Sequence, residues 1–359
     1  MALGGASAIV GAGVVLAPDS SAVPDEGPYF WHGTRAGTDA YAGPFDMLLN
    51  KGFATAQWPQ SDRHIFEYPY GWSATVQSIT NPGRAVSNSG GWWKVLGNEL
   101  FPFSESGWKS WAWAPNYYGH LLEGGIASRR LREWYEGQGV RHPALMAGVT
   151  TWAAAFVNEA YENPEPSVVY AGVTMDLLVF DLGGILLFNH DGLSRFFAQN
   201  LGASIWPTQA SLMIPDAALW NNSHHLVLKV PLGFTDRFSV LLKSGIGFQT
   251  GLTYHRDDDI DVSVGVGQES KKRFIHPETL LETAEFGWAG GLWIDRGGSL
   301  LASLLLDPNT ERFIALNVYP GVVPGLGGVG LWATVSGRGK PSIGFTARRT
   351  LGLGAGFGY

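Results

Sequence analysis

The sequence predicts an all-β fold, an antiparallel up-and-down transmembrane β-barrel, joined to a helical segment in the N-terminal and central part of the chain. From Leu226 onward, short runs with apolar residues at alternate positions are separated by turn residues, which indicates strands with two different faces. The chain also ends on such a run, Leu351–Tyr359, in which apolar residues and glycines alternate up to the final aromatic. A terminal strand of this kind favours a sheet that closes on itself.

Eight alternating runs are expected to form the barrel, and single-chain bacterial barrels have an even number of strands. Strands from the first half of the chain, where His64–Val76 also alternates, would enlarge the barrel to ten or twelve. The eight runs are Leu226–Phe234, Phe238–Tyr254, Ile260–Gly267, Thr283–Asp295, Ser299–Asp307, Arg312–Tyr319, Val329–Ser336 and Ser342–Tyr359.

The second face of these runs is small or polar. In the second run, Phe238 and Leu242 lie on one face, whereas Gly245, Gly247 and Gly251 lie on the other. A soluble sandwich would bury its apolar face and place charged residues on the other one. We therefore expect the apolar face to contact lipid, and the inward glycines predict a narrow, crowded interior.

Composition agrees with this class and excludes several functions. Glycine accounts for 49 of 359 residues and aromatic residues for 13%, whereas charged residues make up only 15%. A mean hydropathy of +0.02 is low for a helical membrane protein. The absence of cysteine excludes disulfides and thiolate chemistry. The net charge is −7 and the longest basic run is Lys271–Arg273, so no nucleic-acid partner is expected.

The N-terminal region is predicted in two parts. Residues 1–22 are small and apolar up to Pro18 and end on a small-residue stretch typical of a signal-peptide cleavage site. No Lys or Arg precedes Arg35, so the basic start of an ordinary signal peptide is missing, and a buried Gly/Ala segment is the alternative. Residues 23–115 are expected to be irregular and partly β, and residues 224–359 to form the barrel.

Residues 116–223 are expected to be helical, because the apolar spacing changes from two toward 3.6. This segment would lie in the periplasm or plug the lumen of the barrel. Three helices are predicted, over Asn116–Gly137, Pro143–Asn163 and Val168–Phe188.

The third helix is strongly apolar yet contains Asp176 and Asp181, which would point about 140° away from each other in an α-helix. Ionisable groups in such a stretch each need a partner or an aqueous cavity. His120, Arg129, Arg130 and Arg132 are the candidate partners. The predicted buried polar cluster consists of Arg130, Glu159, Glu162, Asp176 and Asp181.

Two resemblances imply a location. The terminal Tyr359, with Phe357 and Ala355 at alternate positions before it, resembles the signal that bacterial outer-membrane barrels present to their assembly machinery. The central segment resembles uncharacterised bacterial envelope families in which a helical hairpin adjoins a barrel. The matching positions are Asn116, His120, Asn158, Glu159, Glu162 and Asp176–Gly184. These resemblances imply the bacterial outer membrane, with its lipids and the barrel assembly machinery as partners, and imply no activity.

Four residues are candidates for catalysis. His120 and Glu123 are either a general base with its orienting carboxylate or an ordinary pair on a helix surface. Ser223 and His224 are either part of a serine hydrolase site at the membrane rim or a plain turn. Glu159 and His120 are residue types that hold metals in helical bundles, but the second Glu-x-x-His of such sites is absent, so neither a metal nor a cofactor is expected.

The expected function is therefore non-enzymatic. A barrel would anchor a helical segment that binds a lipid, a small ligand or another envelope protein. One alternative is a lipid-modifying hydrolase or acyltransferase that uses the candidate residues at the membrane rim. The other is a narrow channel, which the inward glycines disfavour.

Overall fold

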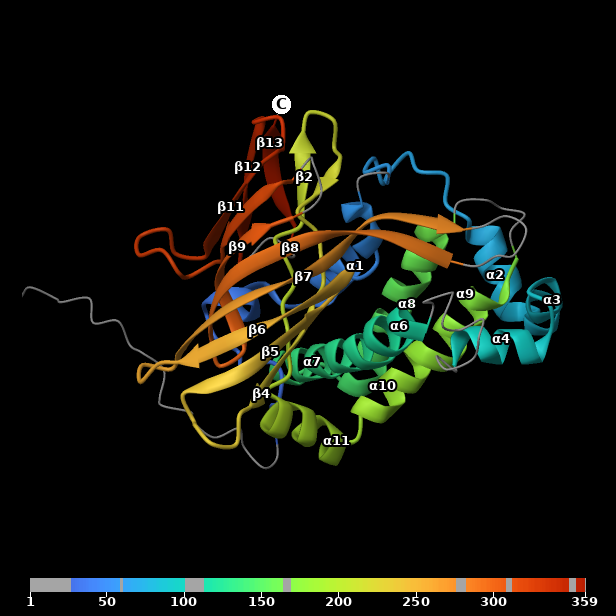
Figure 1. Cartoon of the computed structure of the whole chain (residues 1–359), viewed down its shortest axis with the longest axis horizontal. Coiled ribbons are helices and arrows are strands. Elements are labelled where there is room, and N and C mark those ends of the chain that lie inside the picture. The colour runs from blue at the N-terminus through green and yellow to red at the C-terminus, as the bar shows by residue number, and fades with distance from the viewer. Residues whose placement is uncertain are drawn as a thin grey trace, which may run out of the picture.

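A large, mostly antiparallel sheet of 13 strands lies against a group of helices (Figure 1). The computed structural model describes residues 27–58, 61–100, 113–163, 169–275, 282–307, 312–348 and 353–358. Because the helices form a substantial layer, the predicted all-β class is too narrow. The predicted signal peptide, residues 1–22, lies outside the described residues.

The alternating runs after Leu226 form ten strands rather than eight, because two of the runs fold into hairpins. Each of these strands pairs antiparallel with the next one along the chain. They are β4 (Leu226–Pro231), β5 (Phe238–Ser244), β6 (Gly247–His255), β7 (Ile260–Ile275), β8 (Glu282–Arg296), β9 (Ser299–Leu306), β10 (Ile314–Val318), β11 (Val329–Val335), β12 (Pro341–Ala347) and β13 (Gly354–Gly358).

Three short strands precede them: β1 (Ser204–Ile205), β2 (Ser211–Ile214) and β3 (Leu219–Trp220). The prediction of helix up to residue 223 is wrong for this part of the chain. β1 pairs antiparallel with β4, whereas β2 pairs parallel with β13 and antiparallel with β3. The sheet is not closed into a barrel, since β1 and β3 are its two ends. However, β1 and β2 belong to one segment, residues 204–214, which therefore borders both ends of the series β4–β13.

The two faces of the sheet are reversed relative to those of a soluble protein. Outward side chains are large, apolar and exposed, and they come from every strand from β5 to β13. Inward side chains are largely polar and buried. The exposed ones are Phe238, Leu242, Phe248, Leu252, Tyr254, Val264, Val266, Phe286, Trp288, Leu292, Leu304, Leu306, Ile314, Leu316, Leu331, Val335, Ile343, Phe345 and Phe357. The buried polar ones include Lys229, Ser239, Lys243, Gln249, Thr253, Ser263, Asp295, Ser303, Asn317, Thr334, Ser342 and Thr346.

The inner face of the sheet is crowded, as the glycine pattern predicts. A Cβ atom added to Gly344 would lie 2.4 Å from the Trp332 ring, and one added to Gly356 would lie 2.8 Å from the same ring. The interior is also charged, which the alternating pattern of apolar residues and glycines does not predict. Lys229 Nζ lies 2.6 Å from Asp295, so the buried lysine is neutralised inside the sheet.

The described residues between 27 and 100 form short helices and contain no strand, so the prediction of a partly β region is wrong for them. These helices are η1 (Gly37–Tyr41), α1 (Pro44–Asn50), η2 (Ala54–Gln57), α2 (Trp72–Thr80), α3 (Pro82–Asn88) and α4 (Trp92–Glu99). The alternating aromatic residues at 64–76 reflect ring stacking. Tyr70 stacks on Trp72, which stacks on Phe156 of the long central helix.

The three predicted central helices are present, and the first and third include π-helical turns. They comprise α6 (Trp113–Pro115), η3 (Asn116–Glu123) and α7 (Gly124–Gly137); α8 (Pro143–Glu162); and α9 (Ala171–Met175), η4 (Asp176–Asp181) and α10 (Leu182–Phe188). Then follow α11 (Asp191–Arg195) and η5 (Phe196–Asn200). Among the described residues, Ala171–Phe188 is the one helical stretch with the length and hydropathy of a membrane span. We regard it as a core helix, because 61% of it is buried inside the protein.

The first and third central helices approach closely at glycines. A Cβ atom at Gly125 would lie 2.7 Å from the carbonyl oxygen of Gly184, and one at Gly184 would lie 2.3 Å from that of Leu121. Only residues without a side chain permit this distance between the two backbones. The crossing brings η3 and η4 together, and these two segments carry His120, Asp176 and Asp181 of the candidate site.

Candidate functional site

Two π-helical turns place His120 beside Asp181. The sequence prediction that Asp176 and Asp181 point apart assumes α-helical geometry. The segment η4 runs from Asp176 to Asp181 and is π-helical, so its backbone hydrogen bonds join residues five apart along the chain. Residues five apart therefore lie one turn from each other, and both carboxylates come to the same side of the helix. His120 Nδ1 in η3 lies 3.0 Å from Asp181 Oδ2. Single π turns of this kind are frequent at functional sites.

The pair is buried and charged. The Asp181 side chain is fully buried, and Lys51 Nζ lies 3.5 Å from its second oxygen. Burial opposes ionisation of both groups, but the charges of His120 and then Lys51 hold the pKa of Asp181 below its ordinary value. Burial alone would lower the pKa of His120, but the negative charges of Asp181 and then Asp176 outweigh it and raise this pKa to about 10. His120 is thus an imidazolium at neutral pH.

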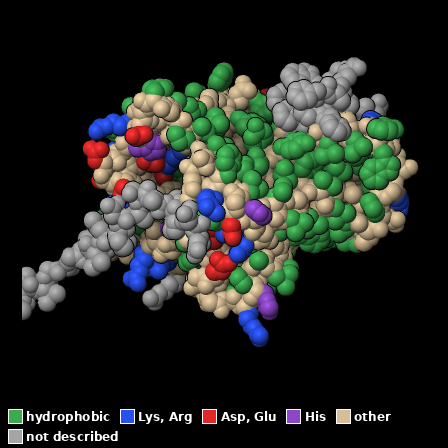
Figure 2. Space-filling view, turned by 90° about the horizontal axis from the view of Figure 1, so that it is seen from below, with side chains coloured by type: hydrophobic (Ala, Val, Ile, Leu, Met, Phe, Trp, Pro, Cys, Tyr) green, Lys and Arg blue, Asp and Glu red, His purple; other side chains and the backbone are tan. Residues whose placement is uncertain are grey.

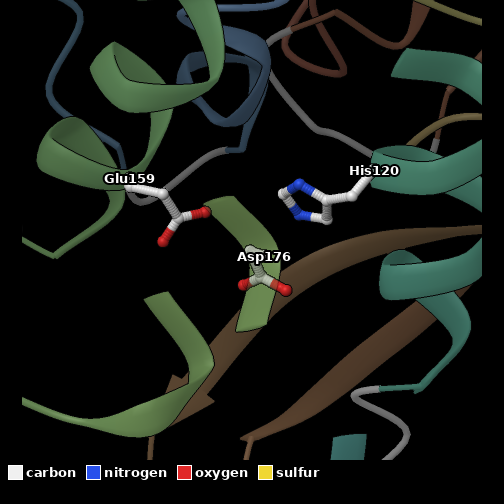
Figure 3. A group of neighbouring side chains, drawn as sticks. All are labelled: His120, Glu159 and Asp176. Carbon is white, nitrogen blue, oxygen red and sulfur yellow. The ribbon is translucent and has the colours of Figure 1, made fainter. Parts of the chain in front are cut away.

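Glu159 of α8 and Asp176 of η4 complete a group of three with His120. The metal-binding atoms of the three side chains all lie within 4.8 Å of one another. Figure 3 shows these side chains arriving from three helical segments and surrounding one common space. Burial raises the pKa of Asp176 well above its ordinary value against the opposing charge of His120, and neighbouring carboxylates, Glu99 first, raise it further.

The predicted polar cluster is assembled in part. Glu159, Asp176 and Asp181 gather around His120, and Glu162 lies close enough to raise the pKa of Asp176. Arg130 lies elsewhere. Its guanidinium is 3.6 Å from Asp39 and 3.6 Å from Asp46, at the contact between α7 and the N-terminal helices.

The remaining predicted partners of the acidic residues also bind elsewhere. Arg129 pairs with Glu133 and Asp191, and Arg132 pairs with Glu136. All three arginines named as candidates therefore neutralise other carboxylates. Of the four candidates, His120 is the one that contacts Asp181.

His120 and Glu123 do not form the predicted pair. Glu123 Oε1 lies 3.1 Å from His224 Nδ1, in the segment that leads into β4. His120 instead contacts Asp181. The two residues therefore belong to neighbouring polar contacts that begin in the same π-helical segment, one directed to η4 and the other to the sheet.

Ser223 contacts His225 and not His224. The distance from Ser223 Oγ to His225 Nε2 is 2.7 Å. This segment is extended, so residues two apart share a face and the intervening His224 points to the other side. All three side chains are buried. Among the described residues, His225 Nδ1 has no partner of standard hydrogen-bond geometry, although the Ser244 backbone lies close enough to act on its pKa, and no described carboxylate pairs with the ring as in a catalytic triad.

His225 predicts a loss of stability in acid. Burial, and then the charge of Lys243, lowers its pKa well below the ordinary value, so the folded protein keeps it neutral. The unfolded chain protonates it below about pH 6.5. The free energy of unfolding should therefore fall as pH decreases below that value, by up to about 1.4 kcal/mol per pH unit from this residue.

Denaturant unfolding in detergent at pH 7 and pH 5 measures this loss. The His225→Asn variant should lose less stability than the wild type over this interval. The control is His190→Asn, which replaces an exposed histidine and should leave the loss unchanged. A His225→Asn variant as acid-sensitive as the wild type would contradict the assignment of a neutral, buried histidine.

Sequence reasoning missed Lys51, which contacts Asp181, and also Asp46 and Asn50 of α1, which bond to each other while Asn50 binds the Ser223 backbone. Asn50 Nδ2 donates to Asp46 Oδ1 at 2.8 Å, and Asn50 Oδ1 accepts the Ser223 N–H at 2.8 Å. The available signal was the spacing of Asp46 and Asn50, which are four residues apart and therefore share one side of a helix. Nothing in the spacing indicates that this side is buried.

Comparison with known proteins adds no assignment, since no family model, no curated protein and no solved structure matches the chain. The resemblance to bacterial envelope families therefore stays an expectation.

Proposed function

We propose that this chain is an integral protein of the bacterial outer membrane, in which the sheet lies in lipid and anchors a ligand-binding helical layer. The reversed faces of the sheet carry the proposal. Val264 is 59% exposed and Trp288 is 74% exposed on the outer face, whereas Asp295 is fully buried on the inner one. Soluble monomers rarely expose continuous apolar patches larger than a few hundred Å². Here such side chains extend over nine strands.

The inner face of the sheet also supports a location in lipid. Lys229 forms ion pairs with Asp295 and Asp261, and Lys243 forms one with Glu269. Buried charges are costly unless they are paired, and these are paired. The inner face also buries apolar side chains such as Trp293 and Leu241, so the exposed apolar residues of the outer face are further surface that lipid would remove from water.

The edges of the sheet are compatible with a bilayer. Backbone groups in hydrocarbon need internal hydrogen-bond partners, which is why spanning sheets are closed. The segment 204–214 pairs with β4 through Ser204 and with β13 through Leu212. Beyond β1, the Trp206 N–H donates to the carbonyl oxygen of His225, which extends that pairing. The first and last strands of the series β4–β13 thus have partners, as a barrel in lipid would require.

The helical layer also presents an apolar surface. Figure 2 shows hydrophobic side chains gathered over the right and upper part of the face seen from below, whereas charged side chains lie at its left and lower centre. Tyr118 of η3 contacts Phe248 of β6 edge to face at 5.0 Å, which joins this surface to the outer face of the sheet. We therefore place the helical layer at the membrane boundary. Its exposed apolar residues include Leu145, Met146, Val149, Leu178, Val179, Leu182, Leu186 and Leu187.

Fractionation of bacteria that express the full chain tests the location. We expect the protein in the outer-membrane fraction and its extraction only by detergent. A lipid-embedded sheet in which β4 and β13 both have partners should also migrate differently on a gel before and after boiling, because it should resist detergent until heated. A monomer that dissolves in buffer without detergent would overturn the proposal.

A lipid-modifying hydrolase is the second candidate function, favoured by the Ser223–His225 contact at 2.7 Å. A neutral His225 is in the protonation state that accepts a proton from a serine hydroxyl. The test is an assay of the purified protein on phospholipid and lipid A, repeated with Ser223→Ala and His225→Ala. Product that forms with the wild type and disappears with Ser223→Ala would establish the enzyme. Unchanged lipid in every reaction would eliminate it.

A narrow channel is the least supported alternative. The aromatic side chains of Trp206, Trp293 and Tyr319 are fully buried together against the inner face of the sheet. They occupy space that a water-filled pore would need. Steady single-channel openings in planar bilayers would be the evidence for this function.

A further inference from the structure

We propose that His120, Glu159 and Asp176 bind one divalent transition-metal ion of the zinc class. This site goes beyond the anchoring role proposed above and does not depend on it. Each residue offers one ligand atom, and each comes from a different helical segment: η3, α8 and η4. The site therefore forms only in the folded chain, and an ion at its centre would fasten the three segments to one another.

The distances fit an ion after small side-chain movements. Two ligands that bind one tetrahedral zinc ion at about 2.1 Å lie about 3.4 Å apart. The three ligand atoms lie within 4.8 Å of one another, so a pair must close by up to about 1.4 Å, or about 0.7 Å for each side chain, for the ion to bind. Three protein ligands leave one position of a tetrahedral ion for water or a substrate, which is the arrangement of open zinc sites.

The surroundings of His120 are those of a metal ligand. Its Nδ1 lies 3.0 Å from Asp181 Oδ2, and Lys51 in turn lies beside Asp181. A carboxylate on one nitrogen of an imidazole fixes the ring, as in most protein sites with a histidine ligand, and an ion that binds the other nitrogen would displace the proton that His120 carries there in the metal-free protein. The His120 side chain is 14% exposed, so the group is open to solvent on one side.

The Asp176 carboxylate gives independent evidence for a bound cation. Its Oδ1 atom is buried and accepts no hydrogen bond from any described residue. Such an oxygen is costly unless a donor or a cation occupies its vicinity. A cation between Asp176 and Glu159 would satisfy this oxygen and offset the negative charge that the two carboxylates bring together.

The donor set selects the class of ion. Calcium and magnesium prefer oxygen ligands alone, whereas an imidazole favours zinc, iron, nickel or copper. One imidazole with two carboxylates therefore favours a first-row transition metal. The sequence lacks a second Glu-x-x-His, which two-metal helical bundles require. A site for a single ion does not need that motif, and here the third ligand comes from η4.

Calorimetric titration of the purified full chain with zinc chloride, after removal of bound metal with a chelator, tests the site. We expect one zinc ion per chain. Glu159→Gln and Asp176→Asn keep the size of each side chain and should abolish measurable binding. Asp181→Asn should weaken binding about 10–100-fold, because Asp181 only positions His120. The matched control is Glu136→Gln on α7, a half-exposed carboxylate that should leave binding unchanged.

A second readout covers variants that fail to fold. Cobalt added to the wild type should give the visible absorption bands of an ion with nitrogen and oxygen ligands, and zinc should displace it. Absence of these bands, or no zinc binding by the folded wild type, would overturn the proposal. The proposal would also be overturned if folded Glu159→Gln and Asp176→Asn bound zinc as tightly as the wild type, or if calcium bound as tightly as zinc.

Discussion

The Lys229→Met variant is expected to lose about 3–5 kcal/mol of unfolding free energy, the typical cost of removing one partner of a buried ion pair. Lys229 Nζ lies 2.6 Å from Asp295 and 2.7 Å from Asp261. Methionine has a similar length and no charge, so Asp295 would remain fully buried without its cation. Denaturant unfolding in detergent, followed by tryptophan fluorescence, measures the loss.

Two further variants make this result specific. Lys340→Met removes an exposed lysine between β11 and β12 and should change the free energy of unfolding by less than about 0.5 kcal/mol. Adding Asp295→Leu to Lys229→Met should recover part of the loss, since the stranded carboxylate is then removed. A Lys229→Met protein as stable as the Lys340→Met control would show that the inner charges of the sheet are not buried as described.

If the outer face lies in lipid as proposed, the Val264→Arg variant is expected to lose about 2–4 kcal/mol in a bilayer or detergent, because an arginine on a lipid-facing strand must leave water. Val264 is 59% exposed and lies opposite Leu252, which is 50% exposed, across the β6–β7 pair. On a surface that faces water, the same change would have almost no effect. The comparison therefore separates lipid from solvent at one outward position.

Val264→Leu is the matched control, since it keeps the position apolar and should leave stability unchanged. Both variants are compared in the same detergent by urea unfolding. If Val264→Arg matched Val264→Leu in stability and dissolved without detergent, the outer face would contact water and the membrane location would be wrong.

The strands could be predicted because alternation records two different environments directly in the residue order. Their number could not, because a tight turn can preserve the alternation. Leu242 of β5 and Phe248 of β6 both lie at even positions and both face outward, although the turn at 245–246 lies between them. Two hairpins were therefore predicted as two single strands.

The site could be predicted only as a set of residue types. His120, Glu159 and Asp176 were all selected as polar residues in helices, but their meeting depends on the helix crossing at Gly125 and Gly184. The side on which Asp176 and Asp181 lie depends on a π turn, and regular 3.6 periodicity gives the wrong answer there. These are consequences of packing between distant segments, and local spacing does not record them.

Spin labels on the outer face test the central claim most directly. The chain contains no cysteine, so Val264→Cys gives one labelling site on β7, and Asp258→Cys gives a control of similar exposure, 54%, in the turn before it. In lipid vesicles, the label at 264 should collide more often with oxygen, which concentrates in hydrocarbon, and the label at 258 with a water-soluble nickel chelate. Equal access of the nickel chelate to both labels would contradict a lipid-facing sheet.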